Sequence, residues 1–164
     1  MDQERSEISF RHLEMPADLA CEFLAVFSRL EYALKAAKYA HGDATRVEAA
    51  WDTFANSVND AFTSIPDRDL QDAVSLLLGA PPRKQVIRDG LVKFVEQVID
   101  RKQSDAQQTL LMVRTVRNNL FHGGKYLPHG EIEVGRNESL VRASLIVLNH
   151  CVSLDDAVND AFQR

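Results

Sequence analysis

The stretch SDAQQTLLMVRTVRNNLFHGG, residues 104–124, combines the clearest helix pattern of the chain with its densest group of polar side chains. A serine followed three residues later by a glutamine, as at Ser104 and Gln107, is a capping-box pattern that marks the start of a helix. The two glycines that close the stretch are typical of a helix end. Three polar side chains precede them: Arg117, Asn118 and His122. We therefore predict a helix that ends in a guanidinium, a carboxamide and an imidazole.

The faces of this helix follow from a rotation of about 100° per residue. Four apolar residues share one face, which we predict to lie in the core: Met112, Val113, Val116 and Leu120. The opposite face carries polar residues: Arg114, Arg117, Asn118 and His122. Three large apolar residues share that polar face: Leu110, Leu111 and Phe121. Because a solvated face seldom mixes large apolar groups with cations, we expect either another helix or a second copy of the chain to cover it.

The rest of the chain also has mostly helical periodicity. Apolar residues at three- and four-residue spacing predict further helices over residues 16–41, 45–64, 67–78, 86–99 and 137–162. The first helix begins at Pro16 and is ended by Gly42. The second begins with a capping-box pattern at Thr45 and Glu48, and its apolar stripe starts at Val47. We therefore predict an all-α fold, a single bundle of about five or six helices.

Composition indicates an ordinary globular protein, with 45% hydrophobic and 26% charged residues in a chain of 164. We assign residues 16–164 to one helical domain that follows an N-terminal lead-in, residues 1–15. No apolar run approaches the roughly 20 residues that a membrane span needs, and the charged N-terminus lacks a signal-peptide core. We expect a soluble, cytoplasmic protein without membrane contact. Cys21 and Cys151 lie in apolar segments and are expected to be buried free thiols.

The formal net charge of −5 bears on possible partners. An acidic chain has no general attraction for nucleic acid, so any contact with RNA would need a local basic patch. No spacing of His and Cys residues resembles a zinc site, and no cluster of carboxylates suitable for Mg²⁺ accompanies the polar helix end. We therefore expect neither a metal nor another cofactor.

The side chains at the helix end suit one kind of chemistry. An imidazole transfers protons near neutral pH, a guanidinium binds phosphate and stabilises negative charge, and a carboxamide can orient either of them. Together they suit metal-free cleavage of a phosphodiester whose nucleophile is already present, as the 2′-hydroxyl is in RNA. Arg114 and Lys125 could hold flanking phosphates. The predicted catalytic residues are Arg117, Asn118 and His122.

The sequence from Arg117 to His122, with a polar residue directly after the arginine, resembles the arginine–histidine signature of the HEPN superfamily. This resemblance implies a small helical bundle. Many members are metal-independent endoribonucleases that dimerise, so that two motifs line one cleft, and they serve as toxins of toxin–antitoxin pairs or in phage defence. By this resemblance Arg117 and His122 are the catalytic pair and Asn118 supports them. The implied partners are RNA, a second copy of the chain and an antitoxin protein.

The chain also departs from part of that superfamily. Members paired with nucleotidyltransferase antitoxins often carry a tyrosine two residues after the histidine, where this chain has Gly124. The difference weakens the case for that antitoxin partnership. Other members lack nuclease activity, so the alternative function is a non-catalytic module that binds a partner protein or a nucleotide.

The candidate residues also have structural interpretations. His122 could be a C-terminal histidine favoured by the helix dipole, and Arg117 could form an ion pair with a carboxylate of a neighbouring helix. Glu31, in the middle of the otherwise apolar first helix, is a candidate for that pair; it could instead orient Arg117 or His122, or be solvated. His150, beside Cys151 on an apolar helix, is expected to be a core or interface histidine.

Overall fold

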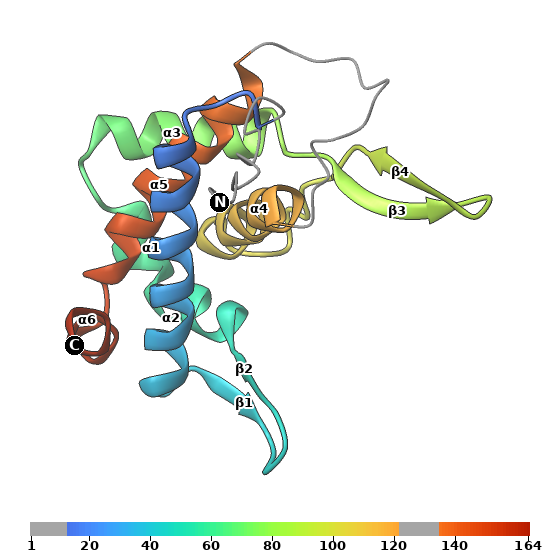
Figure 1. Ribbon diagram of the computed structural model, residues 1–164. Coiled ribbons are helices and arrows are strands. Elements are labelled where there is room, and N and C mark those ends of the chain that lie inside the picture. Colours follow the sequence, from blue (N-terminus) through green and yellow to red (C-terminus); the bar gives the residue numbers. More distant parts are fainter. Residues whose placement is uncertain (1–12, 122–134) are drawn as a thin grey trace, which may run out of the picture.

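The computed structural model describes residues 13–121 and 135–164. Within these residues the chain forms six helices and two small antiparallel sheets (Figure 1). The helices are α1 (Ala17–Ala36), α2 (Trp51–Thr63), α3 (Arg68–Gly79), α4 (Asp105–Phe121), α5 (Arg136–Val152) and α6 (Asp156–Gln163). The strands are β1 (Ala40–Gly42), β2 (Val47–Ala49), β3 (Lys84–Arg88) and β4 (Leu91–Val95). The fold is mainly helical, as predicted, but two hairpins show that the expectation of an all-α fold is wrong.

The helices enclose a hydrophobic core. α1 packs against α5 and α6, α3 packs against α5, and α2 runs along α4. α3 and α5 also contact α4, so this helix is covered by three others (Figure 1). The largest fully buried side chains come from all six helices and include Phe23, Phe54, Leu77, Met112 and Leu148. Each belongs to an apolar stripe that periodicity predicts, and burying it stabilises the fold by about 1.5–3 kcal/mol.

A short hairpin, β1–β2, replaces the predicted end of the first helix and the start of the second. α1 ends well before Gly42, and α2 begins at Trp51 rather than at Thr45. The capping-box prediction is wrong because the Thr45 amide and hydroxyl both donate to Asp43 Oδ1, at 2.7 and 2.6 Å. Gly42 is required here, since its φ is +147° and a Cβ would lie 2.0 Å from a backbone carbonyl oxygen. Val47, predicted to face the core, is 54% exposed.

A second hairpin stands where the sequence predicts a helix over residues 86–99. Asp89 and Gly90 form its two-residue turn with positive φ angles of 54° and 73°, the backbone that a type I′ turn requires. The helix prediction is wrong because an Asp-Gly pair between two runs rich in β-branched residues favours a hairpin. We call residues 84–95 the arm, because they project from the helices (Figure 1).

The last predicted helix, over residues 137–162, is two helices with a break after Val152. Asp155 caps α6, since its Oδ1 accepts a hydrogen bond from the Val158 amide at 3.1 Å. The hydroxyl of buried Tyr39 donates to Asp155 Oδ2 at 2.8 Å and ties α6 to the segment after α1. Periodicity does not indicate the break, because apolar residues continue across it at helical spacing.

The two cysteines differ in environment. Cys151 is buried, and burial raises the pKa of its thiol to about 12. Cys21 is exposed on α1, so the prediction that both thiols are buried is wrong for this residue. Both are free thiols, as expected. The Nε2 of His150 lies 3.5 Å from Oδ2 of Asp67, the cap residue of α3, so this histidine has a partner within the bundle.

Candidate functional site

The N-terminus of α4 is fixed by its own cap and by α2. The Ser104 Oγ accepts a hydrogen bond from the Gln107 amide at 3.2 Å, as the capping-box pattern predicts. From α2, Asn59 Oδ1 accepts from the Ala106 amide at 3.2 Å. Asn56 Oδ1, also on α2, accepts from the Ser104 hydroxyl at 2.8 Å. The start of α4 is therefore held on α2, and its 17 residues carry the polar group to the other end, about 25 Å away.

α2 also covers part of the polar face of α4. Leu110 is 2% exposed, and Arg114 Nη1 lies 3.8 Å from Asp52 Oδ1 on α2. Coverage by another helix, the first of the two expected explanations, therefore accounts for Leu110. It does not account for Phe121, which is 65% exposed at the C-terminal end of the same face. Arg114, predicted to bind a flanking phosphate, already has a carboxylate partner.

Arg117 is held at the helix end by two aromatic rings and by its neighbour. Its guanidinium carbon lies 5.0 Å from the ring centre of Phe27 on α1 and 5.5 Å from that of Phe121. Its Nη1 donates to Asn118 Oδ1 at 2.9 Å. Cation–π contacts stabilise a guanidinium by about 0.5–2 kcal/mol without neutralising it. Within the described part of the chain Arg117 forms no ion pair, so its charge can still attract an anion.

Glu31 does not join this group. Its carboxylate pairs with Lys35 Nζ at 3.4 Å, one turn further along α1. It forms no ion pair with Arg117, so the interpretation of these two residues as structural partners is wrong. His122 and Lys125 lie outside the described residues. Of the predicted catalytic residues, the structure therefore describes the side chains of Arg117 and Asn118 and brings these two together.

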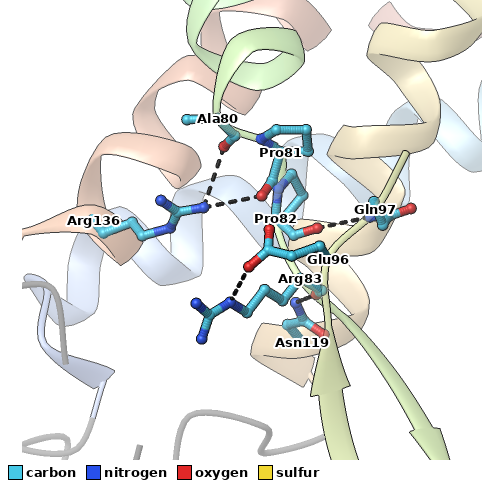
Figure 2. Close-up of polar contacts among 8 residues, drawn as sticks. All are labelled: Ala80, Pro81, Pro82, Arg83, Glu96, Gln97, Asn119 and Arg136. Atoms are coloured by element: carbon cyan, nitrogen blue, oxygen red, sulfur yellow. Dashed lines mark hydrogen bonds and ion pairs between the residues drawn. The ribbon is translucent and has the colours of Figure 1, made fainter. Parts of the chain in front are cut away.

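Two residues near this helix end have contacts that the sequence does not predict. Periodicity assigns Phe27 to the core, where it is 3% exposed, but gives no sign that its ring also faces Arg117. Asn119 is 4% exposed, and its Nδ2 donates to the carbonyl oxygen of Arg83 at 2.7 Å (Figure 2). The sequence does hold one signal for Asn119, because its rotation angle lies close to that of Met112 on the core face.

The connector between α3 and β3 is held by side chains from several elements (Figure 2). Arg136, at the start of α5, donates to the carbonyl oxygens of Ala80 and Pro81, at 3.3 and 2.9 Å. Gln97 Nε2 donates to the Pro82 carbonyl oxygen at 2.8 Å. Side chains therefore satisfy these three carbonyls, as the N–H groups of a regular ladder would in a sheet. Together with the hydrogen bond from Asn119 on α4 to the Arg83 carbonyl, these contacts fix the base of the arm.

The last turn of α4 points three successive side chains in three directions. Successive residues are about 100° apart, so Arg117 lies against α1, Asn119 lies against the connector, and Asn118 is exposed between them. The surface around Asn118 is thus flanked by α1 on one side and by the base of the arm on the other. The candidate site is a half-buried guanidinium and an exposed carboxamide, hydrogen-bonded to each other.

Comparison with protein-family models, with curated proteins and with solved structures finds no match to this chain. The site is therefore interpreted from its own chemistry. In residues 13–121 and 135–164, no three His, Cys, Asp or Glu side chains gather in a way that could hold a metal ion. Among the helices of those same ranges, none is long and apolar enough to cross a bilayer.

Proposed function

We propose that this protein is a metal-independent endoribonuclease of the HEPN type, acting as a toxin or a phage-defence effector. The observation that carries the proposal is the environment of Arg117. Its guanidinium is fixed between the rings of Phe27 and Phe121, is hydrogen-bonded to Asn118, and has no carboxylate partner among the described residues. A cation held in this way at an exposed helix end, five residues before His122, is suited to binding a phosphate group.

The proposed reaction needs no group beyond the side chains and the RNA itself. His122 takes the proton of a 2′-hydroxyl, the 2′-oxygen forms a bond to phosphorus, and the bond from phosphorus to the 5′-oxygen breaks. The protonated His122 gives a proton to the leaving 5′-oxygen and returns to its neutral form, so the products are a 2′,3′-cyclic phosphate and a 5′-hydroxyl. Arg117 stabilises the charge on the pentavalent phosphorus, and Asn118 orients Arg117. Lys125 would hold a flanking phosphate; Arg114 is the weaker candidate for that role, because Asp52 partly neutralises it.

The proposal includes a second copy of the chain. One chain contributes a single Arg117 and a single His122, and a homodimer would place two such pairs in one composite site. The exposure of Phe121, 65% beside the guanidinium, supports an interface at this end of α4. Its ring is the type of side chain that interfaces bury.

The test is cleavage of labelled RNA, single-stranded and structured, in the presence of EDTA. The wild-type protein should produce fragments that end in 2′,3′-cyclic phosphate. His122→Ala and Arg117→Ala should each lower the cleavage rate by about 1000-fold or more. His41→Gln, a change of an exposed histidine in β1, is the matched control and should cut like the wild type. Unchanged cleavage by His122→Ala would remove the proposed mechanism.

The alternative is a non-catalytic HEPN-like module that binds a partner protein or a nucleotide, which the net charge of −5 favours. Expression in cells separates the two functions. If wild type and Arg117→Ala allow equal growth, and the purified protein cuts no RNA, the alternative is the better account. If only the wild type is toxic, the cells should be rescued by whatever antitoxin protein binds it.

A further inference from the structure

The arm has a charge balance unlike that of the rest of the chain. Its two strands carry the cations Lys84, Arg88 and Lys93, the turn between them carries one carboxylate, Asp89, and the arm therefore has a net positive charge, whereas the whole chain has a net charge of −5. None of these three cations forms an ion pair within the described residues. The nearby Glu96 carboxylate is already bonded to Arg83, at 2.8 Å. The arm is thus a local concentration of positive charge, which an acidic chain needs if it is to bind a polyanion.

The strand register places all three cations on the same face of the arm. Residues 84, 86 and 88 of β3 alternate with 85 and 87, and Lys93 pairs with Val86, midway between Lys84 and Arg88. Diagonal neighbours on one face of an antiparallel pair lie about 7–8 Å apart. The cations therefore form a row along the arm. The other face carries Gln85, Ile87, Val92 and Phe94.

The arm is anchored at its base and open at its tip. The base is fixed to α4 by the bond from Asn119 to the Arg83 carbonyl and by the other contacts of the connector. Towards the tip, Ile87 is 77% exposed and Leu91 is 60% exposed, so none of the residues that the structure describes packs over the end of the arm. A two-stranded ribbon of this kind is stable only because its base is held. Its cationic face is accessible to a large ligand.

The position of the arm relative to the candidate site suggests what that ligand is. The surface around Asn118 lies between α1 and the base of the arm. A nucleic-acid strand with one phosphate at Arg117 could continue past Asn118 along the arm, whose strands of five residues extend about 17 Å. That length is enough for several successive backbone phosphates to meet the row of cations.

We propose that the cationic face of the arm binds the sugar–phosphate backbone of the RNA on one side of the cleavage point. This inference rests on the proposed function, because the RNA held by the arm is the substrate of the site on α4. The arm supplies affinity through Lys84, Arg88 and Lys93 and does not read the base sequence, since contacts to phosphates carry no sequence information. The opposite, apolar face is suited to a second copy of the chain, and the experiment distinguishes these two occupants.

The test compares two variants of the arm in the full-length protein. One is the triple variant Lys84→Gln, Arg88→Gln and Lys93→Gln, which removes the charge row. The matched control alters the other face of the same strands, with Ile87→Thr and Val92→Thr. The probe for binding is a fluorescent single-stranded RNA with 2′-O-methyl groups, which cannot be cut because the nucleophile is blocked. Circular dichroism and sedimentation establish that each variant is folded and report its oligomeric state.

The triple variant should bind the probe roughly tenfold more weakly, and the slope of log affinity against log salt should fall by about 2, or 0.7 for each lost phosphate contact. The control should keep the wild-type slope. With a cleavable long RNA, the triple variant should raise KM and leave kcat unchanged, because it removes uniform binding. With a dinucleotide, which is too short to reach the arm, it should cut like the wild type.

The outcomes separate this inference from the proposed function. If RNA is cut but the triple variant keeps the wild-type affinity and slope, the arm does not bind RNA and the nuclease assignment stands. If nothing is cut but the slope falls as expected, the arm binds RNA and the nuclease assignment is wrong. If the Ile87→Thr and Val92→Thr control dissociates a dimer while the triple variant leaves RNA affinity unchanged, the arm holds a second copy and the inference is overturned.

Discussion

Asn118 and Asn119 are neighbours in sequence, on the same turn of α4, but they lie in opposite environments. Asn119 is 4% exposed and donates to the Arg83 carbonyl, whereas Asn118 is exposed and accepts from Arg117. The residue type does not explain this difference; the neighbouring elements do. A connector rich in proline supplies carbonyls beside Asn119, whereas the Asn118 side chain is exposed. We infer that the buried amide holds the fold together and that the exposed one is available for a ligand.

The largest effect expected from this comparison is that of a conservative change on the exposed side, Arg117→Lys. Lysine keeps the charge but lacks the planar fork that binds phosphate and stacks between two rings. RNA cleavage should fall about 100-fold, while the free energy of unfolding should change by less than about 0.5 kcal/mol. Arg142→Lys on α5, which alters an exposed arginine bonded to Glu138, is the matched control and should cut normally. An equal loss of cleavage in both variants would mean that Arg117 has no special role.

On the buried side, Asn119→Ala should act on stability. It removes the hydrogen bond from a side chain that is 4% exposed to the Arg83 carbonyl, and such a bond contributes about 1–1.5 kcal/mol to stability. Urea unfolding should show this loss for Asn119→Ala and a change of less than about 0.5 kcal/mol for Asn118→Ala. Equal effects of the two substitutions would contradict the distinction between a structural and an exposed amide.

The reverse order is expected for activity. Asn118→Ala removes the acceptor that orients the Arg117 guanidinium, and misplacing a catalytic group should slow RNA cleavage about tenfold. Asn119→Ala, assayed well below its unfolding midpoint, should cut faster than Asn118→Ala. Cleavage that depended on Asn119 more than on Asn118 would indicate that the position of the arm, rather than the orientation of Arg117, limits the reaction.

The sequence predicts the bundle well, for a physical reason. The stripes that contain Phe23, Phe54 and Met112 repeat at helical spacing, and burial of an apolar stripe is what stabilises a helix in a protein. The capping box at Ser104 is confirmed because its serine is free to accept from the helix. The pattern at Thr45 fails because Asp43, two residues earlier, takes the threonine hydroxyl and amide into a turn.

The arm shows the limit of periodicity. The spacing of Leu91, Phe94 and Val95 fits one face of a helix, yet the pair Asp89-Gly90 dictates a turn with positive φ at both residues. Short apolar runs fit both the helix period of about 3.6 residues and the strand period of two, so the residues of the turn decide between a helix and a hairpin.

The candidate site was predictable only in part, because it depends on contacts between distant parts of the chain. Arg117 and Asn118 are adjacent in sequence, whereas the ring of Phe27 reaches them only through tertiary packing.

The smallest expected effect concerns a second polar contact between elements, from buried Tyr39 to half-buried Asp155, and it tests whether what holds for Asn119 holds elsewhere. Burial opposes the charged form of Asp155, but hydrogen bonds from the Tyr39 hydroxyl and the Val158 amide, with Lys38 nearby, outweigh it and lower the pKa of this carboxyl below its ordinary value of 3.8. A lowered pKa in the folded state means that the contribution to stability is fully present above about pH 4. The contribution of Asp155 to stability is lost as the pH falls below 3.8 and then through the lowered pKa of the folded state.

Urea unfolding of wild type and Asp155→Asn between pH 7 and pH 3 measures this contribution. At neutral pH the variant should be less stable by about 1 kcal/mol, the worth of a buried hydrogen bond, and the difference should shrink as the solution becomes more acidic than about pH 4. Asp160→Asn, an exposed position on the same helix, is the control and should show a small difference at every pH. A gap between wild type and Asp155→Asn that stays constant down to pH 3 would mean that α6 is held by packing alone. In that case the arrangement at Asn119, where a buried polar group secures a neighbouring segment, would not be repeated at the end of the chain.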